Sequence, residues 1–174
     1  MIKKKGIFIS FEGPECSGKS SQLLQLNKFL KLKKIPFLIT REPGGTDLAE
    51  KLRKIILDKK SSISVIEEIL LLFTARNDHI NTVIKPALKN GYLVISDRFA
   101  DSTFVYQGFV NNYGLKKTFD LHKLLLDNFL PKKTFLFLLN HKEIINRLKK
   151  RKYFNKFDNK NIFFHKKVIQ GYKK

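Results

Sequence analysis

Short apolar runs alternate with longer amphipathic segments along most of the chain. Four runs are bounded by turn residues and have the length of buried strands: residues 6–11, 36–40, 92–95 and 134–139. Around them, the spacing of apolar positions predicts helices at residues 18–33, 48–57, 64–89, 101–127 (one helix or two), 141–152 and 162–172. Strands that alternate with helices predict an α/β fold in which helices flank a parallel sheet.

Two segments interrupt this pattern. Pro86 indicates a bend or a new first turn inside the helix predicted at residues 64–89. Residues 153–161 are polar, rich in Lys and Asn, and suited to a mobile flap. We find no internal repeat and no long linker, so residues 1–174 are expected to form a single domain.

The turn after the first strand carries a phosphate-binding loop. Its residues fit the pattern G-x-x-x-x-G-K-[ST], and the strand before it and the helix after it are the context that such a loop requires. The alternative is an ordinary glycine turn before a helix. Such a turn does not require a strand directly before it, so the observed strand and helix favour the phosphate loop. The loop residues expected to bind a nucleotide are Gly13, Pro14, Glu15, Cys16, Ser17, Gly18, Lys19 and Ser20.

The residue types in the loop match the chemistry of a triphosphate. Gly13 and Gly18 allow successive backbone amides to point at phosphate oxygens, where a Cβ would block close approach. The positive end of the following helix acts at the same place. Lys19 is expected to reach the β and γ phosphates, while the Ser20 hydroxyl binds Mg²⁺. The loop therefore predicts a site for a nucleoside triphosphate and Mg²⁺.

A second candidate for the metal site follows the third strand. Asp97 lies where that strand ends, and P-loop enzymes keep there an acidic residue that holds Mg²⁺, often through water. An Asp that caps the next loop or helix is the alternative. The phosphate loop upstream favours the metal role.

The chain carries a formal charge of +20, from 35 basic and 15 acidic residues. Charge of this size would ordinarily favour nucleic acid or an anionic membrane as a partner. However, 29 of the basic residues are Lys, and Phe, Tyr, Met, Ile, Asn and Lys together number 80 against 24 for Gly, Ala, Arg and Pro. This is the composition expected of an A+T-rich genome, so most lysines are expected to be solvated and nucleic acid is not the expected partner.

The few arginines are more informative than the many lysines. A planar guanidinium binds a phosphate or a base edge through two hydrogen bonds, which an ammonium does not. Arginines kept in a Lys-rich chain therefore mark candidate site positions. They are Arg41, Arg53, Arg76, Arg98, Arg147 and Arg151.

The remaining composition narrows the class of protein. The one cysteine, Cys16, excludes an internal disulfide framework and fits a reducing cytoplasm. The apolar run near the N-terminus is too short for a signal peptide, and no run has the length of a membrane span. The four histidines lack metal-ligand spacing. A cytoplasmic protein without a membrane partner is expected.

Three further motifs follow the phosphate loop in order: R-E-P-G-G-T at residues 41–46, D-R-x-x-x-S at 97–102 and Y-Q-G at 106–108. With them, residues 5–172 closely resemble bacterial thymidylate kinases, and the combination separates that family from adenylate, guanylate and cytidylate kinases. The resemblance implies a P-loop nucleoside monophosphate kinase fold, ATP and Mg²⁺ as donor and cofactor, and a homodimer. It implies phosphorylation of dTMP to dTDP in dTTP synthesis.

The resemblance also assigns roles to individual residues. Arg41 and Arg98 correspond to the arginines that hold the acceptor phosphate, and Asp97 to the acid beside Mg²⁺. Glu15 is similar to the carboxylate that accepts the sugar 3′-hydroxyl, and Arg76 to the helix arginine that reads thymine. The other expected contacts to the deoxynucleotide, where the tyrosine disfavours a ribose 2′-hydroxyl, are Ser102, Tyr106 and Gln107. Arg53 is left open between a site residue and a helix-surface cation.

Two positions depart from the family pattern inside the site. The aromatic residue that usually stacks on thymine, four residues before Arg76, is replaced by Leu72, and an aromatic follows at Phe73, about 100° further around the helix. Either Leu72 provides an apolar platform or the helix adjusts locally. Cys16 occupies a position where some members carry a catalytic arginine, so the catalytic cation is expected in a lid at about residues 147–161. The candidates are Arg147, Arg151 and Lys156, and Lys156 in place of an arginine predicts weaker transition-state stabilisation.

A third departure concerns the end of the chain. Relatives continue beyond residue 174, where they form a fifth strand and a last helix. The resemblance therefore implies a four-stranded sheet without that fifth strand, and the strand at 134–139 is expected to be an apolar edge.

Three alternatives to a dTMP kinase remain open. The chain could phosphorylate another deoxynucleotide or a deoxynucleoside, act as an eroded nucleotide-binding module, or bind DNA through its lysines. The joint presence of five functional residues argues against erosion: Lys19, Ser20, Arg41, Asp97 and Arg98. Composition argues against DNA binding.

Overall fold

The computed structural model describes residues 5–150, 156–157 and 161–174. Within these residues the chain forms a four-stranded sheet in the order β2-β3-β1-β4, and all three pairings are parallel. The strands are β1 (Ile7–Glu12), β2 (Phe37–Arg41), β3 (Leu93–Asp97) and β4 (Lys133–Leu136). The predicted α/β class and the four predicted strands are confirmed.

Strand register brings the carboxyl ends of three strands level with one another. Asp97 at the end of β3 lies opposite Phe11 of β1 and Arg41 of β2. Parallel α/β sheets bind ligands at this edge. The loops that follow β1, β2 and β3 therefore start at one place, although they are far apart in sequence.

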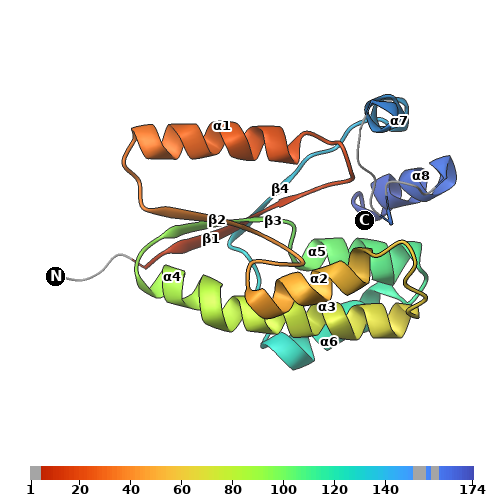
Figure 1. Ribbon diagram of the computed structural model, residues 1–174, viewed down its shortest axis with the longest axis horizontal. Helices are drawn as coiled ribbons and strands as arrows, with labels where there is room; N and C mark the ends of the chain where they lie inside the picture. Colours follow the sequence, from red (N-terminus) through yellow and green to blue (C-terminus); the bar gives the residue numbers. More distant parts are fainter. Residues whose placement is uncertain (1–4, 151–155, 158–160) are drawn as a thin grey trace.

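Helices cover both faces of the sheet (Figure 1). On one face lies α1 (Lys19–Leu32), whose Leu23 and Leu30 pack with Phe11 and Ile95 of the strands. On the other face, Phe8 and Val94 join a larger core with residues of the opposite helical layer. Neighbouring strand residues thus point to opposite faces, as the pleat of a strand requires.

The remaining helices fall into two groups (Figure 1). Those on the second face are α2 (Asp47–Leu57), α3 (Val65–His79), α4 (Lys85–Lys89), α5 (Ala100–Thr103) and α6 (Leu115–Leu126). Two wide-turn π-helical segments continue α3 and α5, namely η1 (Ile80–Ile84) and η2 (Phe104–Val110). At the carboxyl end of the sheet are α7 (His141–Lys149) and α8 (Ile162–Gly171). None of the helices in the described residues has the length and apolar composition needed to cross a bilayer.

The observed boundaries refine the predicted ones. The helix predicted at residues 64–89 is the continuous run of α3, η1 and α4, and Pro86 lies in the first turn of α4 as expected. The strand predicted at 134–139 ends at Leu136, because its partner β1 ends at Glu12 in that register. β4 is an edge strand of the described sheet, and its Leu136 is exposed, as expected for an apolar edge.

Candidate active site

A cavity of about 380 Å³ opens at the carboxyl ends of β2 and β3, beside the phosphate loop. Lys19 is the one lysine among the described residues that line it. Four of the six arginines in the sequence line it as well: Arg41, Arg53, Arg76 and Arg98. The arginines gather at one site while most lysines do not, in agreement with the interpretation of the composition.

The phosphate loop curls around the ammonium group of Lys19. Lys19 Nζ donates hydrogen bonds to the backbone carbonyls of Gly13 and Pro14, both at 2.8 Å. Burial, followed by the nearby positive charge of Arg98, lowers the pKa of Lys19 to about 8. Gly13 has a φ of +137°, and a Cβ there would lie 2.2 Å from the carbonyl oxygen of Phe137. The tight path of the loop therefore requires glycine at this position.

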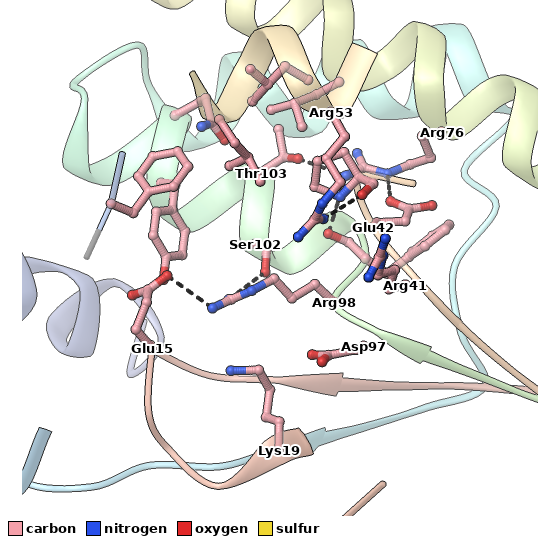
Figure 2. Close-up of a pocket in the computed structure, with 18 of the residues that line it drawn as sticks. Glu15, Lys19, Arg41, Glu42, Arg53, Arg76, Asp97, Arg98, Ser102 and Thr103 are labelled. Carbon is pink, nitrogen blue, oxygen red and sulfur yellow. Dashed lines mark hydrogen bonds and ion pairs between the residues drawn. The ribbon is translucent and has the colours of Figure 1, made fainter. Parts of the chain in front are cut away.

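Asp97 and Ser20 line the cavity beside Lys19, and Figure 2 shows Asp97 at the end of β3, close to the lysine. The Oδ1 atom of Asp97 is buried and has no hydrogen-bond partner in the part of the chain that the structure describes. An unpaired buried carboxylate oxygen is unfavourable, and Mg²⁺ prefers such oxygen ligands. No group of three or more His, Cys, Asp or Glu side chains could hold a metal in the described ranges. The pair fits Mg²⁺, which takes most of its ligands from water and phosphate.

Arg98 connects the phosphate loop to the helices behind the cavity (Figure 2). It follows β3 with a left-handed backbone, φ +72°. Its guanidinium donates to the Gly13 carbonyl at 2.8 Å, to Ser102 Oγ at 3.2 Å and to Glu15 Oε1 at 3.1 Å. Burial alone would raise the pKa of Glu15, but Arg98 and the hydroxyl of Tyr106, 2.7 Å away, lower it. Arg98, Ser102, Tyr106 and Glu15 are thus brought together, as predicted.

Glu12 organises this part of the site, although the sequence pattern does not single it out. It is fully buried at the end of β1. It accepts hydrogen bonds from the Phe99 amide at 2.6 Å, from Ser102 Oγ at 2.6 Å and from the Tyr172 hydroxyl at 3.1 Å. Burial, and secondarily the charge of Asp101, raises the pKa of Glu12. The one sequence signal for Glu12 is that an acidic residue directly follows the apolar residues of β1, at the carboxyl end of the strand.

Arg76 is held rigidly at the other end of the cavity. Its Nε donates to Glu42 at 2.6 Å, and its Nη2 donates to Thr103 Oγ1 at 2.8 Å. Glu42 is also 3.0 Å from Nδ1 of His79. The Nη1 atom of Arg76 is buried and finds no acceptor among the described residues. Because Arg76 lines the cavity, this donor suits a carbonyl oxygen of a bound ligand.

Two more arginines lie on the wall between these ends. Arg41 forms an ion pair with Glu50 at 3.0 Å, and its side chain is 55% exposed. Arg53 donates to the carbonyl oxygen of Pro43 at 2.6 Å, and burial lowers its pKa. Arg53 also lines the cavity, so its side chain is not confined to the outer surface of α2. With Arg98, these side chains form a positive wall suited to phosphate.

The structure distinguishes the two candidates for contact with a base. Leu72 lines the cavity, one turn before Arg76 on α3. Phe73 does not reach the cavity and packs in the core beside His122, with ring centroids 6.1 Å apart. One residue is about 100° of helix rotation, so the two side chains face different surroundings. Phe99, which the sequence does not predict, lines the cavity with its ring 5.2 Å from the Arg76 guanidinium.

The candidate lid cations lie in different places. Arg147 on α7 donates to the backbone carbonyl of Cys16 in the phosphate loop, at 3.3 Å. Lys156 instead donates to Glu68 of α3, which also accepts from Gln107, a cavity residue. Arg151 lies outside the described residues. Lys156 is thus paired with Glu68 of α3, whereas Arg147 contacts the phosphate loop directly.

Comparison with known proteins identifies the group to which this geometry belongs. The family model described as thymidylate kinase matches residues 11–174. The chain is 39% identical over 169 residues to the thymidylate kinase of Caldicellulosiruptor saccharolyticus, which covers 97% of this chain and 82% of that protein. It is 42% identical over 164 residues to the thymidylate kinase of Rickettsia typhi, with 94% and 80% covered.

A solved structure gives the same result for the fold. The crystal structure of thymidylate kinase from Ehrlichia chaffeensis matches with a TM-score of 0.75 at 29% sequence identity. The match covers 97% of this chain and 85% of that chain.

The Arg76–Glu42 pair generates a prediction about stability. Glu42→Gln removes the charge that balances buried Arg76, and breaking a buried pair in this way costs about 3 kcal/mol or more. We expect the free energy of unfolding, measured by urea denaturation, to fall by that amount. Glu50→Gln is the matched control, since its partner Arg41 is half exposed and the loss should stay below about 1 kcal/mol. Equal losses in the two variants would contradict the role of the buried pair.

The lowered pKa of Lys19 predicts proton uptake when ATP binds. With a pKa of about 8, about half of the Lys19 side chains are neutral at pH 8 in the free protein. Phosphate charges raise the pKa, so binding at pH 8 should take up about half a proton, and much less at pH 7. Calorimetry in two buffers of different ionisation enthalpy measures this number. A Lys19→Arg variant, which stays protonated, should show no uptake; the same uptake in both proteins would assign it to another group.

Proposed function

Because the chain belongs to the thymidylate kinase family, we propose that it transfers the γ-phosphoryl group of MgATP to the 5′-phosphate of dTMP, giving dTDP and ADP in dTTP synthesis. One observation carries the proposal. Lys19 and Asp97 lie at one end of the cavity, Arg76 at the other, and Arg98 between them. A donor and an acceptor nucleotide would meet at Arg98.

The donor end would hold the triphosphate. The loop amides and Lys19 would bind the β and γ phosphates. Ser20 and Asp97 would hold Mg²⁺, which would supply charge neutralisation. Arg147 is the cation that we assign to the place of the missing loop arginine. Its Nη1 atom lies 3.9 Å from where a Cβ of Gly18 would stand, directly over the loop.

The acceptor end would hold dTMP. Arg98 and Arg41, with Arg53 beside them, bind the 5′-phosphate, and Glu15 accepts a hydrogen bond from the sugar 3′-hydroxyl. Tyr106, which donates to Glu15, fills the space near the 2′ position. The remaining contacts are to the base and its edge, from Leu72, Arg76, Ser102 and Gln107.

The reaction needs alignment more than acid–base chemistry. An oxygen of the dTMP phosphate, already anionic, forms a bond to the γ-phosphorus while the bond to the β,γ-bridging oxygen breaks and ADP leaves. No general base is required. Catalysis comes from holding the two nucleotides in line and from neutralising charge on the transferred group, which is the work of Lys19, Arg98 and Arg147.

We also propose that residues 1–174 act as one kinase domain and that two copies associate in the cytoplasm. Ile66 and Leu70, one turn apart on α3, are 55% and 54% exposed and form a short apolar stripe on that helix. Such an apolar stripe supports a helix-to-helix dimer contact. Sedimentation of the purified protein measures the state directly.

An acceptor panel tests the proposed reaction. With MgATP, we expect dTMP to give the highest kcat/KM, dUMP to follow, and dCMP, dGMP and thymidine to give little product, because Leu72 and Arg76 suit a methylated pyrimidine with a carbonyl edge. Release of ADP in a coupled assay measures each rate. Equal rates with several acceptors would point to another kinase, and no turnover with bound ATP would point to an eroded module.

Arg98 provides the sharpest single-residue prediction. Arg98→Lys keeps the positive charge beside Glu15 but loses the two-pronged contact to phosphate, so we expect kcat with dTMP to fall about a hundredfold. ATP affinity should change little, because Lys19 and the loop amides bind the triphosphate. Rapid-quench turnover and ATP titration measure the two quantities, and turnover that stays unchanged would remove Arg98 from the mechanism.

A further inference from the structure

We propose that Glu68 is a positioning residue that anchors Lys156 and Phe157 beside the acceptor half of the cavity, and that Lys156 works through this anchor and not on the transferred phosphoryl group. The inference deepens the proposed function and rests on it. The lid pattern in the sequence makes Lys156 a candidate catalytic cation. The inference gives Lys156 a positioning role instead.

Glu68 belongs to the same face of α3 as two acceptor residues. Leu72 and Arg76 follow it at intervals of four residues, which is about one helical turn each. Leu72 and Arg76 line the cavity, and Glu68 lies directly beyond them with 3% of its surface exposed. A carboxylate so deeply buried must be paired, because an uncompensated charge there is strongly unfavourable.

Both oxygens of Glu68 are used by partners that are distant in sequence. Oε1 accepts from Gln107 Nε2 at 2.5 Å, and Oε2 accepts from Lys156 Nζ at 2.5 Å. The Lys156 side chain is itself only 19% exposed. Because Gln107 donates its amide hydrogen to Glu68, its carbonyl oxygen is left to act as an acceptor. Glu68 thereby orients a cavity residue and binds the lysine with one group.

The residue after Lys156 is fastened on a second side. The Phe157 ring lies 5.4 Å from that of Tyr106 and 6.4 Å from that of Phe164 on α8, in one apolar cluster. Phe157 also lines the cavity. An ion pair to α3 and an aromatic contact to η2 thus hold residues 156–157 against the acceptor half.

The positions of the cations agree with this division of roles. Lys19, Arg98 and Arg147 each contact a residue of the phosphate loop. Lys156 is bound by the carboxylate of Glu68, which is not part of the loop. Losing the Glu68–Lys156 pair should therefore loosen Gln107 and Phe157 and weaken dTMP binding, without changing the groups that hold ATP.

A double-mutant cycle tests the inference. Glu68→Gln and Lys156→Met, alone and together, are assayed for kcat, for the KM of dTMP and for the KM of ATP. Loss of a hydrogen bond to a charged group changes an equilibrium constant by about tenfold, so the lost positioning in each single variant should raise the KM of dTMP by up to about tenfold. The double variant should raise it no further. In all three, kcat and the KM of ATP should stay within about threefold of wild type, and Lys156→Arg should restore the KM of dTMP.

Matched controls separate this effect from general damage. Glu67→Gln changes the neighbouring residue on α3 and keeps its capping box, because Gln also fits that position. Lys166→Met removes an exposed lysine of α8. Both should behave like wild type, and thermal unfolding identifies any variant that fails to fold.

Two results would overturn the inference while leaving the proposed function intact. One is a fall in kcat with an unchanged KM of dTMP in Lys156→Met, which would make Lys156 a catalytic cation. The other is a multiplicative effect in the double variant, which would show that the two residues act independently. Failure of the proposed function itself has a different signature, namely a wild-type protein that does not phosphorylate dTMP.

Discussion

The buried carboxylate of Glu12 is the constraint on which the rest of the site depends. It stands at the end of β1 and accepts hydrogen bonds from the segment after β3 and from Tyr172, just beyond α8. Losing the bond from the buried Phe99 amide to Oε1 would be costly, which favours the observed path from Asp97 to Ser102. That path turns Arg98 into a left-handed conformation and directs its guanidinium across the cavity. The strained residue is the one that we place between the two nucleotides, as is common where function overrides local preference.

The sequence predicts well what depends on local pattern and motif. Periodicity located each strand and helix to within a few residues. The motifs, with the family resemblance that rests on them, singled out Lys19, Arg76 and Arg98, which all line one cavity. It does not predict partners that are remote along the chain. Glu68 and Lys156 are 88 residues apart, and no local pattern records that a buried carboxylate on α3 would bind a cation of the lid. The sequence makes Lys156 a candidate catalytic cation, and only the structure shows that its side chain is paired with Glu68.

The structure shows what the few arginines of this Lys-rich chain have in common. Most basic residues of the chain are lysines, and in water a point charge serves as well as a planar one. Arg41, Arg76 and Arg98 lie where the guanidinium makes contacts in fixed directions to a carboxylate or to backbone oxygens. In a chain of such biased composition, net charge says little about function. The positions that carry arginine and not lysine are more informative.

The number of residues in the wide-turn segment η2 matters to the site as much as their types do. Tyr106 and Gln107 are neighbours in η2, yet both face the cavity, and they bind carboxylates on two different elements, Glu15 of the phosphate loop and Glu68 of α3. Loss of one residue between Phe104 and Val110 would narrow the wide turn and change which of its side chains face the cavity, because one residue is about 100° of helix rotation. A deletion there would disrupt the acceptor site even if Tyr106 and Gln107 were both retained. The number of residues between Ser102 and Gly114 is therefore as necessary to the acceptor site as any of its arginines.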